Sequence, residues 1–379
     1  MRWTPSNVTE AGGTVKGMIL TPAGWMQGRL HFGAAILRIE PDRSAPTDRF
    51  VMPGFVDLHV HGGGGADCMD GADAVRAMAA FHVRHGTTSL LATTVTAPAA
   101  DLRRAAIGIA EACARPAPGD ARVLGMHLEG PFISPDALGA QPPHAIPPNP
   151  ALAEELCTLA PLHVATVAPE VDPDGALLTL LTARGVRVQI GHTTCTYAQA
   201  RNALHRGATG FTHLFNAMTP LHHRAPGAAG CALAHAAHAE IIPDLLHVSP
   251  GALLAALRAI PGLYGVTDAV SATGMPDGDY RLGQHRIVKS GGAARLPGGG
   301  LAGSILTMGQ ALRNLLHLGL PLDQAARRLS TIPAGYAGLH DRGHLRPGAA
   351  ADLAVVDAAG NVHAVFAEGR RAATLPPAP

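Results

Sequence analysis

The 379-residue chain is long enough for one large domain and a minor one. Hydrophobic residues make up 47% of the sequence and charged residues 15%, which favours a compact interior over disorder. The formal net charge is +1 and the basic residues are scattered, which disfavours a nucleic-acid-binding surface.

The cysteines and the first residues of the chain favour a reducing compartment. The five cysteines are odd in number, widely spaced and free of any C-x-x-C pair, which argues against a disulfide framework and a thiolate zinc site. The N-terminus leads into no apolar signal segment, and no apolar run approaches the roughly 18 residues of a membrane span. We therefore expect a soluble, cytoplasmic protein with no membrane or nucleic-acid partner.

The two ends of the chain have a similar pattern. Residues 1–50 contain short apolar stretches separated by Gly and Pro, which predict short strands with turns. Residues 351–357 and 362–366 flank a turn at Gly360-Asn361 and predict a hairpin. We expect residues 1–50 and 346–379 to form one small β-sandwich-like domain beside a larger catalytic domain of residues 51–345.

Between the two ends, apolar β-type runs alternate with helical stretches rich in Ala, Leu and Arg, the pattern of repeated βα units. Eight candidate strands predict an α/β fold, a (β/α)8 barrel, in which the carboxyl ends of all strands open onto one mouth. The predicted strands are 54–61, 88–96, 123–129, 163–168, 186–192, 210–216, 239–247 and 263–268. The polar residues that end several of them are then expected to converge, namely His61, Glu129, His192, His213, His247 and Asp268.

The first predicted strand carries a His-x-His pair. Period-2 alternation puts His59 and His61 on one face of the strand, where both imidazoles can bind one ion, and Gly62 allows close backbone approach. Such a pair on its own is more often part of a packed or exposed strand. Its position at the end of the first barrel strand favours a metal site.

Three further strand ends extend this set. Burying the Glu129 carboxylate without a cation costs several kcal/mol, so Glu129 is a candidate ligand, whereas His127 is expected to pack or to orient another ligand. Taken separately, a histidine in the position of His192 or of His213 is more often a hydrogen-bonded core or loop residue than a metal ligand. Taken jointly, four imidazoles and one carboxylate suit one or two zinc-like or iron-like ions.

The eighth strand ends in a candidate catalytic group. An aspartate in the position of Asp268 can reach both a water molecule and a scissile bond, so we assign it as general base and then general acid. The alternative for Asp268 is a helix N-cap.

Several motifs resemble those of the amidohydrolase superfamily and, within it, the N-acetylglucosamine-6-phosphate deacetylase family. The resemblance covers nearly the whole chain. HLEGPF and HLFNAM are specific to the deacetylases, whereas PGFVDLHVHG belongs to the superfamily at large. The matching segments are 53–62, 86–88, 127–132, 191–193, 212–218 and 301–304.

The resemblance implies a metal-dependent hydrolase that removes the acetyl group from a 2-acetamido sugar 6-phosphate. Glu129, His192 and His213 would hold the main divalent cation, zinc or iron, with Asp268 as the acid/base. His59 and His61 leave room for a second ion. The chain would form a homodimer in which Arg224 reaches the neighbouring site. The implied substrate contacts are Ala140, Gln141, Asn216, Ala217, Arg224, His247, Leu301, Ala302, Gly303 and Ser304.

Three alternatives stay open. One is a deacetylase for the galactosamine epimer. Another is a dihydroorotase-like or isoaspartyl-dipeptidase-like enzyme, which is disfavoured because its carboxylated lysine could come only from Lys16 or Lys289, neither at a strand end. The third is a catalytically silent barrel scaffold, which is disfavoured because neither the metal ligands nor Asp268 are lost.

Overall fold

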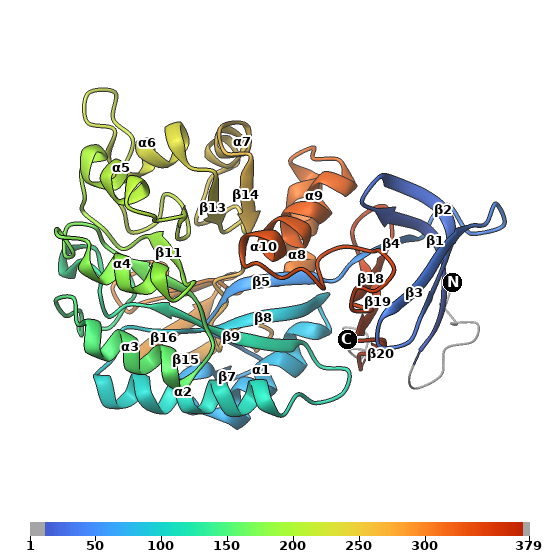
Figure 1. Cartoon of the computed structure of the whole chain (residues 1–379), viewed down its shortest axis with the longest axis horizontal. Coiled ribbons are helices and arrows are strands. Elements are labelled where there is room, and N and C mark those ends of the chain that lie inside the picture. Colours follow the sequence, from blue (N-terminus) through green and yellow to red (C-terminus); the bar gives the residue numbers. More distant parts are fainter. Residues whose placement is uncertain (1–11, 374–379) are drawn as a thin grey trace.

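Eight parallel strands form the predicted barrel in the computed structural model, which describes residues 12–373 (Figure 1). Six strands pair side by side in the order β12-β11-β10-β9-β8-β5, and β13 pairs with β14. The strands are β5 Phe55–Val60, β8 Thr87–Thr94, β9 Arg122–Glu129, β10 Leu162–Val167, β11 Arg187–Ile190, β12 Gly210–Phe211, β13 His238–Ile241 and β14 Gly262–Gly265.

Backbone hydrogen bonds close the ring between these two groups of strands. The amide of Leu214, just after β12, donates to the carbonyl of Glu240 on β13 at 2.9 Å. The amide of Asp268, after β14, donates to the carbonyl of His59 on β5 at 2.9 Å. The fold class expected from the sequence is confirmed.

Helices cover the outside of the barrel, so that strands such as β5 and β8 are buried along their whole length, as expected for a parallel sheet with both faces covered. The helices are α1 Ala72–Val83, α2 Ala99–Ala114, α3 Pro150–Leu159, α4 Ala176–Ala183, α5 Tyr197–His205, α6 Gly227–His235, α7 Pro250–Ala259, α8 Met308–His317, α9 Leu322–Leu329 and α10 Thr331–Tyr336, with short 3-10 turns at Cys68–Asp70 and Pro135–Ala137.

Most barrel strands end earlier than the sequence pattern predicts, and at four of them the polar residues expected at the tip are affected. β11 ends at Ile190, β12 at Phe211, β13 at Ile241 and β14 at Gly265, so the polar residues expected at their tips lie in the loops that follow. The backbone explains the difference at His192, His213 and Asp268, whose φ angles are 46°, 27° and 51° and therefore incompatible with an extended strand. The predicted strand ends are corrected accordingly.

A second sheet is built from both ends of the chain (Figure 1). Its order is β20-β19-β18-β4-β1-β2-β3, and the hairpin predicted near the C-terminus is confirmed as β18 and β19. Residues 1–11 and 374–379 of the predicted small domain lie outside the described residues, and its boundary with the barrel stays a prediction. The strands are β1 Gly13–Thr21, β2 Gly24–Phe32, β3 Ile36–Pro41, β4 Phe50–Pro53, β18 Leu353–Val356, β19 Val362–Ala367 and β20 Arg370–Arg371.

One buried arginine connects the barrel with the C-terminal part of this sheet. Arg342 is 7% exposed, donates from Nη1 to the Ser89 hydroxyl on β8 at 3.0 Å and pairs with the Asp352 carboxylate at 3.2 Å. Because burying an unpaired charge is expensive, this pair makes the packing of the two sheets mutually dependent.

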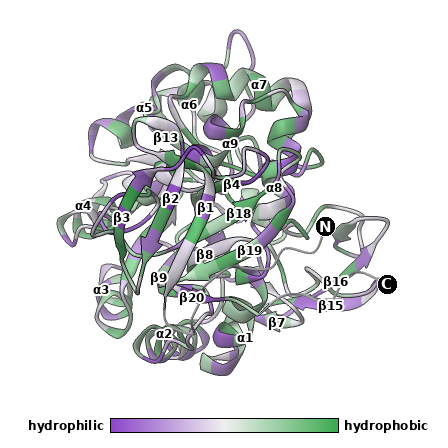
Figure 2. Ribbon diagram, turned by 90° about the vertical axis from the view of Figure 1, so that its right-hand side faces the viewer, coloured by the Kyte–Doolittle hydropathy of each residue, from purple (hydrophilic) through white to green (hydrophobic). Residues whose placement is uncertain are grey.

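An antiparallel three-stranded sheet, β15 Gly278–Leu282, β16 His285–Ser290 and β17 Ala293–Arg295, follows the last barrel strand and was not predicted. Figure 2 shows the β15–β16 hairpin projecting from the barrel with largely hydrophilic residues. Two shorter strands, β6 Gly62–Gly63 and β7 Ala66–Asp67, follow β5. Among residues 12–373, no helix combines the length and apolar composition needed to span a membrane.

Candidate metal centre and active site

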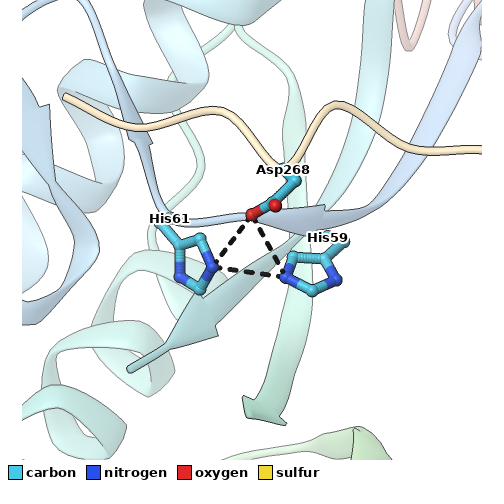
Figure 3. A group of neighbouring side chains, drawn as sticks. All are labelled: His59, His61 and Asp268. Carbon is cyan, nitrogen blue, oxygen red and sulfur yellow. Dashed lines mark hydrogen bonds and ion pairs between the residues drawn. The ribbon is translucent and has the colours of Figure 1, made fainter. Parts of the chain in front are cut away.

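The two histidines of the predicted pair point to the same side of β5, as the alternation requires (Figure 3). Their Nε2 atoms are 3.2 Å apart. Asp268 meets them from the loop after β14, with its Oδ1 atom 3.5 Å from His59 Nε2 and 3.2 Å from His61 Nε2. This half of the site is called the β5 half below. A Cβ atom at Gly62 would lie 2.4 Å from the Ala66 carbonyl oxygen, so the turn after the pair requires glycine.

The other predicted ligands form a second cluster, the loop half. Glu129 ends β9, and its Oε1 atom lies 3.2 Å from His192 Nε2 and 2.9 Å from His213 Nε2. The two Nε2 atoms are 3.1 Å apart.

Glu129 also joins the two halves. Its Oε1 atom lies 3.4 Å from His59 Nε2, and its Oε2 atom lies 3.2 Å from His61 Nε2. All five predicted ligands and Asp268 are buried and converge at the barrel mouth.

The outer hydrogen bonds of the imidazoles indicate that this cluster suits a divalent cation. His61 Nδ1 lies 2.9 Å from the Thr93 carbonyl and His192 Nδ1 lies 2.9 Å from the Ala137 carbonyl, and because carbonyls only accept, both Nδ1 atoms donate. His59 Nδ1 lies 2.9 Å from a carboxylate oxygen of Glu240 and also donates. In the neutral rings the Nε2 lone pairs therefore face one another at about 3 Å, an arrangement that a bound cation stabilises.

The pKa shifts agree with this interpretation. Burial lowers the pKa of His61, but hydrogen bonds with Asp268 and Glu129 outweigh it and raise that pKa to about 9. The pKa of Glu129 is lowered well below its usual value by His59 and His192, against the effect of burial. The pKa of Asp268 is lowered by His59 and His61. The carboxylates thus stay ionised. Their negative charge must be balanced by protons on the imidazoles or by a metal ion.

Strained backbone holds three of these residues. His192, His213 and Asp268 all have positive φ values, which cost of order 1–3 kcal/mol each for non-glycine residues. The His213 amide donates to Glu240 Oε2 at 3.3 Å, and the Asp268 carbonyl accepts from the Ser304 amide at 2.7 Å. Contacts with neighbouring segments thus fix the backbone conformation that aims His213 and Asp268 at the centre.

A pocket of about 600 Å³ opens above the ligands, and most of the predicted substrate contacts line it. Those in the lining are Ala140, Gln141, Asn216, Ala217, His247, Leu301 and Gly303.

Three predicted contacts are placed differently. Ala302 is buried, and its amide donates to the Ala294 carbonyl. The Ser304 hydroxyl donates to the Thr267 carbonyl at 2.5 Å, so this side chain supports the Asp268 loop. Arg224 is exposed on the loop before α6, stays outside the pocket lining and contacts His223 Nε2 at 2.9 Å. A single chain does not bring Arg224 into its own site.

Gln141 and His247 have defined partners at the pocket wall. The Gln141 side chain accepts from the Thr96 amide at 2.6 Å and donates from Nε2 to Glu129 Oε2 at 2.5 Å, so it orients the carboxylate that joins the two halves. The Asp244 carboxylate accepts from His247 Nδ1 at 2.6 Å. Burial lowers the pKa of His247, but this contact with Asp244 outweighs burial and raises it.

Sequence reasoning missed the partners of the β5 half. Glu240 and Thr93 hold the Nδ1 atoms of His59 and His61, and Asp57 accepts from the Thr267 hydroxyl at 2.6 Å beneath them. The sequence contained one sign that Glu240 has a role, because this charged residue interrupts the apolar start of the strand predicted from Ala239. Both ring nitrogens of His127 are hydrogen-bonded, Nδ1 to the Leu58 carbonyl and Nε2 to the Thr166 hydroxyl, so neither is hydrogen-bonded to a predicted metal ligand.

The barrel and the buried imidazoles and carboxylates at its mouth together define a metal-dependent hydrolase of the amidohydrolase class. The sequence profile described as "Amidohydrolase family" matches residues 50–372. An N-acetylgalactosamine-6-phosphate deacetylase from Escherichia coli O157:H7 is 39% identical over 370 residues, 93% of this chain and 97% of that protein. An N-acetylglucosamine-6-phosphate deacetylase from Lysinibacillus sphaericus is 37% identical and covers 87% of both chains.

Solved structures agree with the sequence relatives. A variant of N-acetyl-D-glucosamine-6-phosphate deacetylase from Mycobacterium smegmatis, in complex with N-acetyl-D-glucosamine-6-phosphate, superposes with a TM-score of 0.90 and 34% identity over 96% of this chain and 100% of that one. The Thermotoga maritima deacetylase gives a TM-score of 0.88 and 31% identity, again over 96% and 100%. The chain belongs to the amidohydrolase superfamily and, within it, to the N-acetylglucosamine-6-phosphate deacetylase family.

Proposed function

We propose that this protein hydrolyses the acetamido group of N-acetylglucosamine 6-phosphate to acetate and glucosamine 6-phosphate, in amino-sugar catabolism or recycling. The observation that carries the proposal is the buried ligand set around Glu129, placed together with Asp268 at the floor of one pocket. The substrate follows from family membership and from the Mycobacterium smegmatis relative with its bound sugar phosphate.

Glu129, His192 and His213 would hold the main ion, zinc or iron, and His59 and His61 a second one. A divalent cation there supplies Lewis-acid chemistry, which makes water more nucleophilic at neutral pH and withdraws electrons from a carbonyl oxygen. The Nε2 atoms and the carboxylate offer the nitrogen and oxygen donors that such ions prefer.

Asp268 would carry the proton. As a carboxylate it accepts a proton from the attacking water, whose oxygen becomes part of acetate. It then donates that proton to the sugar nitrogen as the C–N bond breaks. Its backbone contacts with His59 and Ser304 keep the carboxylate at the pocket floor, within 3.5 Å of the β5 imidazoles.

Two pocket residues would stabilise the developing negative charge on the acetyl oxygen. His247 donates from Nδ1 to Asp244, which orients the ring toward the pocket, and its raised pKa favours a protonated ring. Gln141 has two Nε2 hydrogens, one of which goes to Glu129 and leaves the other for a substrate carbonyl.

Arg224 would bind the substrate phosphate of a neighbouring subunit in a homodimer. The arginine fork matches phosphate geometry, and its exposed position outside its own pocket suits a contact in trans. We place the reaction in the cytoplasm, which accords with five free cysteines.

The galactosamine epimer is a second candidate substrate, because the Escherichia coli relative with 39% identity is an N-acetylgalactosamine-6-phosphate deacetylase. The two sugars differ in one hydroxyl orientation.

Acetate release from both epimeric sugar phosphates tests the assignment. With the metal-loaded protein, we expect a higher kcat/KM for N-acetylglucosamine 6-phosphate than for its epimer. The unphosphorylated sugar should be a poor substrate because Arg224 loses its partner. A preference for the epimer would reassign the substrate, and no acetate from either would overturn the proposal.

A further inference from the structure

The buried carboxylate of Glu240 stands outside the set of residues to which the proposed chemistry gives a role. Glu240 lies on β13, is fully buried and does not line the pocket. A buried charge is retained at a cost unless its hydrogen bonds are satisfied, so its partners indicate what it does.

Glu240 touches both halves of the metal centre. Its Oε2 atom accepts from His59 Nδ1 at 2.9 Å and from the His213 backbone amide at 3.3 Å. Its Oε1 atom accepts from the Tyr264 hydroxyl at 3.4 Å. The contact with His59 involves the side chain that faces the centre, whereas the contact with His213 involves only the backbone.

Among the four imidazoles and within residues 12–373, His59 alone has an anionic outer partner. His61 and His192 donate to neutral backbone carbonyls, and His213 Nδ1 has no hydrogen-bond partner in the described part of the chain. A carboxylate at Nδ1 fixes the tautomer and makes Nε2 a better ligand than a carbonyl does.

We propose that Glu240 is a positioning residue that gives the β5 half its affinity for a second ion. It holds His59 as the Nδ1–H tautomer, so that the Nε2 lone pair faces His61 and Asp268. The inference rests on the proposed metal-dependent function and deepens it. His127 and Glu240 do not form a further ion site, because both ring nitrogens of His127 are already hydrogen-bonded.

The test is a titration of the chelator-treated full-length protein with Zn²⁺ alone, in competition with a chromogenic chelator and with elemental analysis of the bound metal. Wild type should bind two ions. Glu240→Gln keeps an acceptor for His59 but removes the charge, and should weaken one of the two ions about 10-fold. Glu240→Leu removes the acceptor for His59 and also the acceptor for the His213 backbone amide, so it should weaken that ion about 100-fold and the other ion by less.

Two control variants separate this role from a general loss of packing. Tyr264→Phe removes the hydroxyl that donates to Glu240 Oε1 and does not change the contact between Glu240 and His59, and Glu170→Gln removes a different carboxylate, which accepts from Thr193 and Thr194. Both should bind two ions as wild type does. Circular dichroism and thermal unfolding check that each variant folds. If Glu240→Leu does not fold, the titration of Glu240→Gln alone tests the inference.

Nitrogen NMR of the metal-free protein gives a readout independent of metal binding, with a proton expected on His59 Nδ1 in wild type and Glu240→Gln whether or not Nε2 is also protonated. Unchanged affinity for both ions in Glu240→Gln would overturn the inference, as would equal weakening of both ions or a wild type that binds one ion at saturation. A protein that binds Zn²⁺ as described but releases no acetate would refute the proposed function and leave the role of Glu240 intact.

Discussion

The two halves of the metal centre are built in different ways. In the β5 half, His59 lies on an extended strand and His61 directly follows it, so simple alternation aims both rings at one point. In the loop half, His192 and His213 follow their strands with positive φ angles, and only contacts with neighbouring segments hold that conformation. Alternation within one strand therefore reveals the first half, whereas the second half was predicted from the ends of separate strands and from motifs.

The halves also differ in their outer partners. A carboxylate supports the β5 half through Glu240, whereas a neutral carbonyl supports the loop half through Ala137. Glu129 belongs to both. Variants that change one half, both halves or neither will show whether metal binding in one half depends on the other.

Removing the shared carboxylate has the largest expected effect. Glu129→Ala should lose both ions and all measurable acetate release, because a direct ligand contributes more than the roughly 10–100-fold in affinity that an outer partner does. Elemental analysis measures the loss. His61→Ala is the matched variant and should keep the ion of the loop half. Retention of either ion by Glu129→Ala would contradict the central position of this carboxylate.

Asp268→Asn should lower kcat by roughly 10²–10⁴ while the loop half keeps its ion, because the amide cannot accept a proton from water. Steady-state acetate release and metal analysis of the same preparation measure both quantities. Activity within tenfold of wild type would remove Asp268 from the mechanism.

Gln141 is not a proposed metal ligand but contacts one, Glu129, so Gln141→Leu should have a smaller effect. It removes the donor to Glu129 and the acceptor for the Thr96 amide, so we expect kcat/KM to fall roughly 10–100-fold and both ions to bind more weakly. Chelator competition and kinetics on the same variant test this. Normal metal binding with a raised KM would assign Gln141 to the substrate alone.

Arg342→Ala tests whether the β5 side of the barrel depends on the terminal sheet, since Arg342 contacts Ser89 on the strand beside β5. Breaking the buried pair with Asp352 should lower the free energy of unfolding by about 3–5 kcal/mol. Chemical denaturation measures it. Adding Asp352→Asn should recover part of the loss, and an equally unstable double variant would point to lost packing instead.

The smallest expected effect is a loss of stability at acid pH, which we attribute to a buried histidine beside the β5 half. His82 donates from Nε2 to the Gly62 carbonyl next to His61, and burial lowers its pKa from 6.5 to about 4. Because the unfolded chain binds this proton more tightly, stability should fall as the pH drops from 6.5 towards 4, by about 2 kcal/mol at pH 5. His85 nearby has a similarly lowered pKa and adds to the slope.

Denaturation of wild type and His82→Gln at pH 7 and pH 5 measures this contribution. The glutamine amide can still donate to Gly62 but does not titrate in this range. An unchanged pH dependence in the variant would assign the acid sensitivity to other groups.

The sequence predicts the barrel because alternating apolar and helical segments leave few other ways to cover a parallel sheet. It also predicts which polar residues converge, although strands β11 to β14 are shorter than the pattern suggests. The β15–β17 sheet was missed because its strands are partly exposed and carry no long apolar run.

The sequence by itself determined the proposed ligand set, because each of its residues stands at the end of a predicted strand or within a motif, namely His59, His61, Glu129, His192 and His213. Only the tertiary structure decided what orients them. Glu240 reaches His59 across 181 positions of sequence, and the Gln141 amide turns toward Glu129. Such contacts depend on barrel closure and on how the loops pack at the barrel mouth, which are properties of packed neighbours and not of any local pattern.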